Sequence, residues 1–258
     1  MVTLEDVKAF WNARPCNIRH SEKPVGTRDY FDEVEARKYF VEPHIPRFAA
    51  FDRWRGKRVL EIGCGIGTDA INFIRAGADY TGVELSADSL AVARQRLEVF
   101  GLKGALLEGD AESLGDVVAD GRFDLVYSFG VLHHTPDPRA AVRQVRRVLK
   151  PDGEFRLMLY AKHSWKAAMI ASGLDQPEAQ YGCPIANSYS RDDVADLLEG
   201  FDIAAIEQDH IFPYKVDAYK AYQYEKEAWF AAMPADVFRA LETTLGWHLL
   251  ITATPRPR

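Results

Sequence analysis

Residues 59–68 read VLEIGCGIGT, an apolar run followed by glycines at positions 63, 65 and 67. The apolar run is typical of a buried strand, and the residues after it start a helical pattern. Glycines at such a turn permit left-handed backbone conformations and let a ligand approach the main chain closely. Thr68 stands where a dinucleotide-binding GxGxxG loop requires its last glycine, which disfavours a nicotinamide dehydrogenase. The stretch therefore predicts a ligand-binding turn between a strand and a helix.

Short apolar runs alternate with helical patterns after this turn. One helix is predicted from its N-cap Ser86 to Gly101, and another over 136–149, before a turn at 150–153. The predicted strands of this half are 58–62, 79–84, 105–108, 123–129 and 154–161. Such alternation is typical of βαβ units and of a mostly parallel sheet. We therefore predict an α/β fold.

The alternation continues more weakly beyond residue 161. Strands are predicted at 201–208 and 247–254, and a helix begins at Ser190. The intervening stretches are rich in aromatic residues, Tyr181 among them. Because ligands of open α/β sheets bind beyond the carboxyl ends of the strands, insertions that follow strands are well placed to cover the site as a lid. Most of these aromatic side chains could instead simply pack the insertions onto the sheet.

These patterns divide the chain into three parts. The first is an N-terminal helical lid segment over 1–57, and the second is a ligand-binding core over 58–161. The third is the C-terminal half of the sheet, 162–258, with lid insertions at 162–189 and 209–246.

Two carboxylates stand at predicted strand ends. Glu84 lies about 20 residues beyond the glycine turn, where a carboxylate can accept hydrogen bonds from both hydroxyls of a ribose. Asp110 follows the third strand and could accept a hydrogen bond from the exocyclic amine of adenine. Either residue could instead be only a solvated strand end or a turn carboxylate.

Together these motifs resemble the class I S-adenosylmethionine-dependent methyltransferases. The resemblance rests on 61–68, Val83-Glu84, Gly109-Asp110, the strand FDLVYS at 123–128 and the turn LKPDG at 149–153. The segment VLHH at 131–134 is similar to that of small-molecule methyltransferases. The likeness covers roughly residues 58–161 closely. It implies a Rossmann-like, seven-stranded, mostly parallel sheet with helices on both faces, in which the last strand runs antiparallel.

The resemblance implies S-adenosylmethionine as cofactor and S-adenosylhomocysteine as product. The methionine end would lie on the glycine turn, the ribose at Glu84, and the adenine at Asp110 and the Ala111 backbone. Cys64 is interpreted as a small loop residue rather than a nucleophile, because the sequence indicates no general base beside it. The expected cofactor-binding residues are Glu61, Gly63, Cys64, Gly65, Gly67, Thr68, Glu84, Leu85, Asp110, Ala111 and Ser128.

An oxygen or nitrogen acceptor must lose a proton during methyl transfer, and a histidine is a usual agent. His133 is the first candidate for this catalytic base, because it follows the fourth strand; either residue of the His133-His134 pair could instead cap the next turn. Further polar candidates, His44, His163 and His210, are taken as structural. The expected substrate-binding residues are Trp11, Arg19, Tyr30, His134, Tyr160, Tyr189 and Tyr214.

Composition narrows the class of protein. The 258 residues are 47% hydrophobic and 27% charged, as in soluble globular proteins. The 32 Lys and Arg face 38 Asp and Glu, a net charge of −6 that disfavours a nucleic-acid partner. The N-terminus has no signal-peptide pattern and no apolar run reaches about 18 residues, so we expect a cytoplasmic protein without a membrane partner. The oligomeric state stays open.

The main hypothesis is a methyltransferase that acts on an oxygen or nitrogen of a small molecule. One alternative is a regulatory module that binds the cofactor without turnover. Another is arsenite or thiol methylation, since Cys16 and Cys183 both lie in predicted lid segments. No cysteine pair or other ligand pattern predicts a metal site. Nucleic-acid methylation is further disfavoured because no Asn/Asp-Pro-Pro-aromatic tetrapeptide follows the fourth strand.

Overall fold

The computed structural model describes residues 2–174 and 182–257. Its sheet has the order β3-β2-β1-β4-β5-β8-β7, and β8 runs antiparallel to both of its neighbours. The strands in this order are β3 Ala105–Glu108, β2 Asp79–Glu84, β1 Arg58–Ile62, β4 Phe123–Phe129, β5 Leu149–Ala161, β8 His248–Pro255 and β7 Phe201–Asp209. The predicted Rossmann-like sheet with an antiparallel last strand is therefore confirmed. A short extra strand, β6 Ser188–Tyr189, pairs with β5 off this path.

The strand boundaries differ from the prediction mainly at β5. Leu149 already pairs with Phe123, and the register then shifts so that Leu125 pairs with Glu154. The four residues predicted as a free turn, 150–153, therefore form an irregular part of the strand. A hydrophobic pattern does not reveal this, because Leu149 also completes the apolar stripe of the preceding helix.

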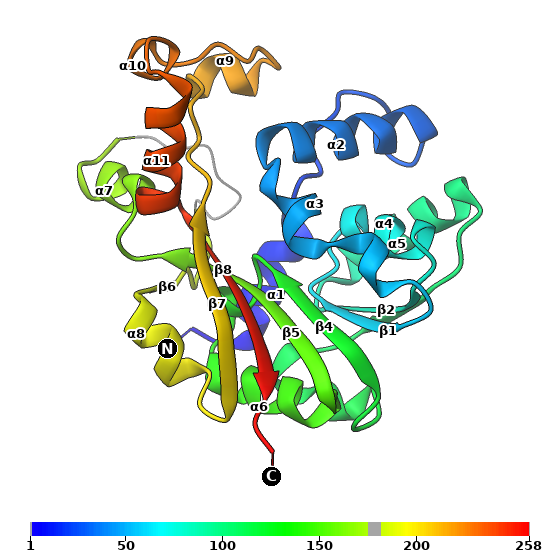
Figure 1. The fold of residues 1–258 in the computed structure, drawn as a ribbon. Helices are drawn as coiled ribbons and strands as arrows, with labels where there is room; N and C mark the ends of the chain where they lie inside the picture. Colours follow the sequence, from blue (N-terminus) through cyan, green and yellow to red (C-terminus); the bar gives the residue numbers. More distant parts are fainter. Residues whose placement is uncertain (1, 175–181, 258) are drawn as a thin grey trace.

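Helices cover both faces of the sheet (Figure 1). Along β4, Leu125 and Tyr127 face one apolar core and Val126 faces the other, as the two-residue period of a strand requires. The first core also includes side chains of α4 Thr68–Arg75 and α3 His44–Ala49. The second includes side chains of α6 Pro138–Val148 and α8 Arg191–Leu197.

The helix ends follow the capping residues read from the sequence. Ser86 caps α5 Ala87–Phe100 by accepting a hydrogen bond from the backbone N–H of Ser89, and the helix ends at Gly101 with φ of 64°. Ser190 caps α8 in a reciprocal pair with Asp193. These ends were predictable because they depend on contacts between residues close in sequence.

The remaining helices gather at one end of the sheet, the end at which all strands but β8 terminate. Figure 1 shows α2 on one side and α9 to α11 on the other. They are α1 Leu4–Ala13, α2 Arg28–Val41, α7 Trp165–Ala171, α9 Val216–Lys220, α10 Ala228–Ala231 and α11 Ala235–Leu245, with short 3-10 helices η2 Ala111–Asp116 and η3 Leu132–His134. Another 3-10 helix, η1 Phe51–Trp54, comes just before β1. Tyr181, predicted as part of the aromatic lid, lies outside the described residues. Within the described residues, the helices are all too short or too polar to span a bilayer.

Candidate active site

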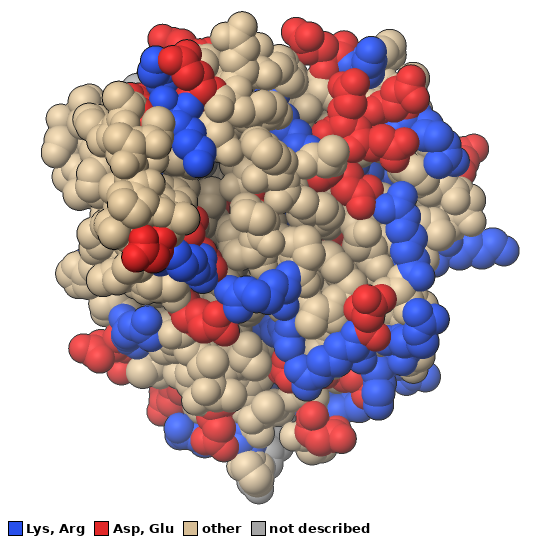
Figure 2. Space-filling model, turned by 45° about the horizontal axis from the view of Figure 1, so that its top comes forward, with Lys and Arg blue, Asp and Glu red and all other residues tan. Residues whose placement is uncertain are grey.

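A cavity of about 790 Å³ lies at this end of the sheet. Its floor comes from the residues that follow β1, β2, β3 and β4, and its walls come from α1, α2, the 14–21 loop and the start of β8. On the face shown in Figure 2, acidic and basic side chains are interspersed among uncharged ones. The residues that the sequence placed at strand ends thus meet at one site, as the topology of an open parallel sheet requires.

The glycine turn lies against this cavity. Gly63, Gly65 and Gly67 have φ values of 74°, 53° and 78°, a region that residues with a side chain rarely adopt. A Cβ on Gly65 would meet no atom within 4 Å, so the backbone here is open to a ligand. A Cβ on Gly63 would lie 2.2 Å from the Val131 side chain, and one on Gly67 would lie 3.2 Å from the Ala93 side chain. Gly67 therefore serves the packing of the turn on α5.

Glu84 is held rigidly at the cavity rim. One carboxylate oxygen accepts the Gly65 N–H at 2.8 Å, and the other accepts the Ser86 N–H at 2.8 Å. Burial raises the pKa of Glu84, while these backbone hydrogen bonds act in the opposite direction. Each oxygen keeps a further lone pair, so the carboxylate can still accept hydrogen bonds from a ligand.

Asp110 and Ala111 line the cavity beyond β3. The Asp110 side chain accepts the Glu112 N–H at 3.0 Å and so caps the short helix η2. This contact fixes the carboxylate and the Ala111 backbone relative to the strand end.

A buried polar network lies beneath the turn. The Asp69 carboxylate accepts hydrogen bonds from Lys38 Nζ at 2.7 Å, the Tyr39 hydroxyl at 2.9 Å and the Tyr127 hydroxyl at 3.0 Å. Burial alone would lower the pKa of Lys38, but Asp69 raises it above its ordinary value. Sequence reasoning missed both residues. Asp69 directly follows the turn and could have been suspected, whereas nothing in the pattern of α2 marks Lys38.

Glu61 lies beside this network with 4% of its surface exposed. It accepts a hydrogen bond from the Tyr80 hydroxyl at 2.6 Å. Burial, together with the negative charge of Asp69, raises the pKa of Glu61 to about 8. The cavity floor therefore holds a carboxyl group that titrates near neutral pH.

The predicted cofactor-binding residues fall into two groups. Those that line the cavity are Glu61, Gly63, Cys64, Gly65, Thr68, Glu84, Leu85, Asp110 and Ala111. Gly67 and Ser128 are absent from the lining that the described residues form. Ser128 is fully buried, and its hydroxyl has no hydrogen-bond partner among the described residues.

The predicted substrate-binding residues also fall into two groups, those that line the cavity and those that do not. Trp11, Arg19, His134 and Tyr160 line the cavity. Among the described residues, the lining does not include Tyr30, Tyr189 or Tyr214. The Tyr30 hydroxyl instead donates to the Ile18 carbonyl, Tyr189 packs against the core, and Tyr214 stacks on Phe40. Tyrosines in lid segments can thus pack the lid itself, which a sequence pattern does not distinguish from ligand contact.

His133 does not occupy the position expected of a catalytic base. The side chain is fully buried, its ring centroid lies 3.8 Å from that of Tyr160, and it is not part of the lining that the described residues form. Both ring nitrogens lack a hydrogen-bond partner among the described residues. The short helix η3 turns consecutive side chains in different directions, so the sequence alone could not separate the two histidines.

His134 lines the cavity instead. Its Nδ1 lies 2.6 Å from the Ile185 carbonyl oxygen. Because a carbonyl only accepts, Nδ1 carries the proton and Nε2 is the basic nitrogen. Burial lowers the pKa of His134 to about 4, so the ring is neutral at physiological pH.

The three cysteines are free thiols. Cys16 lines the cavity, and burial raises its pKa to about 11. The Cys183 sulfur lies 3.1 Å from the Ile185 carbonyl oxygen.

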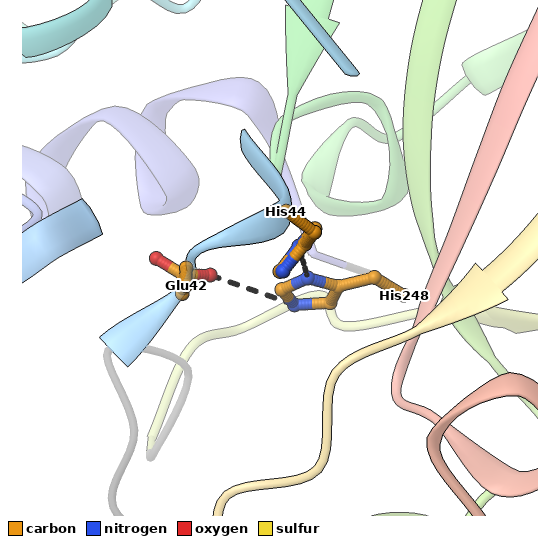
Figure 3. Close-up of side chains that lie close together, drawn as sticks. All are labelled: Glu42, His44 and His248. Carbon is orange, nitrogen blue, oxygen red and sulfur yellow. Dashed lines mark hydrogen bonds and ion pairs between the residues drawn. The ribbon is translucent and has the colours of Figure 1, made fainter. Parts of the chain in front are cut away.

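A second cluster of ionisable side chains adjoins the cavity (Figure 3). It consists of Glu42, His44 and His248, and Glu42 and His248 line the cavity. His44 Nε2 lies 2.9 Å from His248 Nδ1, and His248 Nε2 lies 3.8 Å from a Glu42 oxygen. Sequence reasoning took His44 as structural and missed the other two residues, because they come from segments about 200 residues apart with no motif.

Comparison with known proteins agrees with this geometry. Residues 60–157 match the family described as a methyltransferase domain. A structure of magnesium protoporphyrin IX methyltransferase from Synechocystis with bound SAH matches 98% of this chain and 100% of its own, with a TM-score of 0.64 and 17% identity. Residues 60–157 are thus similar to a methyltransferase domain, and the sheet order and the glycine turn agree with that similarity.

Two proteins with the same name are similar to part of this chain. A ubiquinone biosynthesis O-methyltransferase from Erwinia tasmaniensis is 34% identical over 119 residues, which is 45% of this chain and 49% of the relative. A protein of the same name from Cronobacter sakazakii is 30% identical over 158 residues, which is 60% of this chain and 64% of the relative. The chain thus spans about half to two thirds of the length of these relatives.

Proposed function

We propose that the protein transfers the methyl group of S-adenosylmethionine to an oxygen of a small-molecule acceptor. The observation that carries this proposal is the single cavity into which the glycine turn, Glu84 and Asp110 converge. The choice of oxygen over nitrogen is supported by the O-methyltransferase names of the curated relatives. The cytoplasmic location and the lack of a nucleic-acid partner stay predictions from the sequence.

The residues present fit the cofactor. The open space at Gly65 leaves room for the methionine end, Glu84 retains lone pairs for the ribose hydroxyls, and Asp110 with Ala111 stands where the adenine would lie. When bound, the cofactor supplies a sulfonium methyl group, which is already an activated electrophile. The protein therefore needs chiefly to align the acceptor and exclude water.

The acceptor would occupy the half of the cavity lined by aromatic side chains and His134. Trp11, Tyr160 and Trp247 provide flat apolar walls there, which suit a planar acceptor. We propose that Nε2 of His134 takes the proton of the acceptor hydroxyl, since Nδ1 is committed to the Ile185 carbonyl. His133, which the sequence predicted for this role, is fully buried and is not part of the cavity lining that the described residues form.

The test is titration of S-adenosylhomocysteine into the purified chain by calorimetry. We expect binding to the wild type, and Glu84→Ala should weaken it at least about tenfold, since the ribose loses a charged hydrogen-bond acceptor. Asp88→Ala, on the exposed first turn of α5, is the matched control and should bind normally. No binding to folded wild-type protein would refute the proposal.

Turnover separates the enzyme from a binding module. The wild type is offered S-adenosylmethionine with panels of phenols, other alcohols and amines, and formation of S-adenosylhomocysteine is measured. An acceptor-dependent product from the hydroxyl panel supports O-methylation. Cofactor binding without product across broad metabolite extracts would favour the regulatory module.

A further inference from the structure

Glu42, His44 and His248 form a cluster whose geometry the proposed methyl transfer does not yet use. One ligand atom from each residue lies within 4.8 Å of the other two. Figure 3 shows the three side chains converging from the α2–α3 junction and the start of β8. Both histidines are buried, with 5% and 3% of their surfaces exposed. The three residues come from segments far apart in the sequence, so their close approach depends on the tertiary fold.

Hydrogen bonding accounts for only part of this arrangement. The 2.9 Å contact between the two rings uses one nitrogen of each. The remaining nitrogen of His248 lies 3.8 Å from Glu42, which is too far for a hydrogen bond. The Glu42 carboxylate therefore lies near the two imidazoles but is not hydrogen-bonded to His248.

The backbone holds the three residues firmly. His248 is the first residue of β8 and pairs with Tyr160 on one side and Asp209 on the other. Glu42 is the C-cap of α2, and His44 begins α3 after Pro43. Ligands fixed on rigid elements are what a preorganised metal site requires.

The distances also suit a metal ion. Zn²⁺ bonds to imidazole nitrogen at about 2.0–2.1 Å. One ligand atom from each of the three residues lies within 4.8 Å of the other two, so a single ion bound among them would replace the hydrogen bond between the two rings. Two imidazoles and one carboxylate are also the donor set of catalytic zinc sites that keep a position open for water or substrate.

We propose that Glu42, His44 and His248 bind a divalent transition-metal ion, with Zn²⁺ as the ion that the donor set suits best. Because Glu42 and His248 line the cavity, a bound ion would lie at the cavity wall. Metal binding itself does not depend on the proposed function. Its catalytic consequence rests on that function: a bound ion would lower the pKa of an acceptor hydroxyl coordinated to it, the proton would pass to His134, and the sulfur–methyl bond would break as the oxygen–methyl bond forms.

The experiment is a Zn²⁺ titration of the full chain after chelator treatment, in competition with a chromophoric chelator. We expect one Zn²⁺ per chain, and Co²⁺ in its place should give visible d–d absorption. Glu42→Gln, His44→Asn and His248→Asn should each weaken Zn²⁺ binding at least about tenfold. His163→Asn, which alters an exposed histidine outside the cluster, is the matched control and should bind normally.

Affinity for S-adenosylhomocysteine is measured on every variant, so that loss of the fold is recognised. If the His248→Asn variant does not fold, the Zn²⁺ affinity of Glu42→Gln, which changes a residue at the helix end, tests the metal site. Absence of stoichiometric Zn²⁺ in the wild type, or unchanged binding in the folded cluster variants, overturns the metal site. Methyl transfer unaffected by chelator would remove the catalytic role alone, and failure to bind S-adenosylhomocysteine would count against the proposed function instead.

Discussion

At the scale of single residues, the two adjacent histidines show how one position changes a side chain's role. His133 is enclosed between Tyr160 and His134, whereas His134 reaches the cavity with its Nδ1 proton fixed by the Ile185 carbonyl. The sequence predicted His133 as the base after the fourth strand, whereas the cavity lining formed by the described residues includes His134 and not His133. The sequence could not indicate which of the two, since that depends on the direction of η3 and on packing against β5.

This difference predicts opposite results for two alanine variants. His134→Ala should lower turnover by about 10²-fold or more while S-adenosylhomocysteine affinity stays nearly constant, because a base acts only in the chemical step. His133→Ala should lower the melting temperature and leave turnover per folded molecule largely intact. Steady-state kinetics and thermal unfolding check both. Normal turnover in His134→Ala would remove its role as the base.

Glu61 predicts a pH dependence of stability. Its pKa is raised from 4.5 to about 8 in the folded protein, so between these values the folded state keeps a proton that the unfolded chain has lost. The contribution of Glu61 to the unfolding free energy therefore falls as pH rises through this window. We expect the wild type to lose more stability than Glu61→Gln between about pH 5 and pH 8. Urea unfolding across this range measures the difference, and parallel curves would contradict the assignment.

At the scale of elements, the Lys38–Asp69 ion pair fastens the N-terminal helix α2 to α4 of the core. The nitrogen–oxygen distance is 2.7 Å, and the side chains are only 11% and 1% exposed. Removing one partner of a buried pair leaves the other charge without compensation. The N-terminal helix α2 is thus joined to the site through the same network that lies under the glycine turn.

Lys38→Met should therefore destabilise the protein by about 3–5 kcal/mol. The exposed pair Lys8–Glu108, which joins α1 to β3, provides the matched control. Lys8→Met should cost no more than about 1 kcal/mol, since solvent screens an exposed pair. Chemical denaturation measures both free energies. Equal losses in the two variants would show that the Lys38 pair has no special structural role.

At the scale of the whole molecule, the sheet and most of the cavity-lining residues at the strand ends were predictable from the sequence. Strand ends, helix caps and the glycine turn depend on neighbours in the chain, and an open parallel sheet brings successive strand ends together. Asp69 with Lys38, and Glu42 with His248, were not predictable. Each pair joins the N-terminal helices to distant parts of the chain, and the periodicity of the sequence does not indicate how these helices pack on the core.

We propose that the carboxyl end of this sheet binds an adenosine-containing sulfonium cofactor. A crystal structure of the full chain grown with S-adenosylhomocysteine tests it most directly. We expect both ribose hydroxyls within hydrogen-bonding distance of the Glu84 carboxylate, with the adenine beside Asp110 and Ala111. A complex in which the ligand lies elsewhere, with no contact to Glu84 or the Gly63–Gly65 backbone, would contradict the claim.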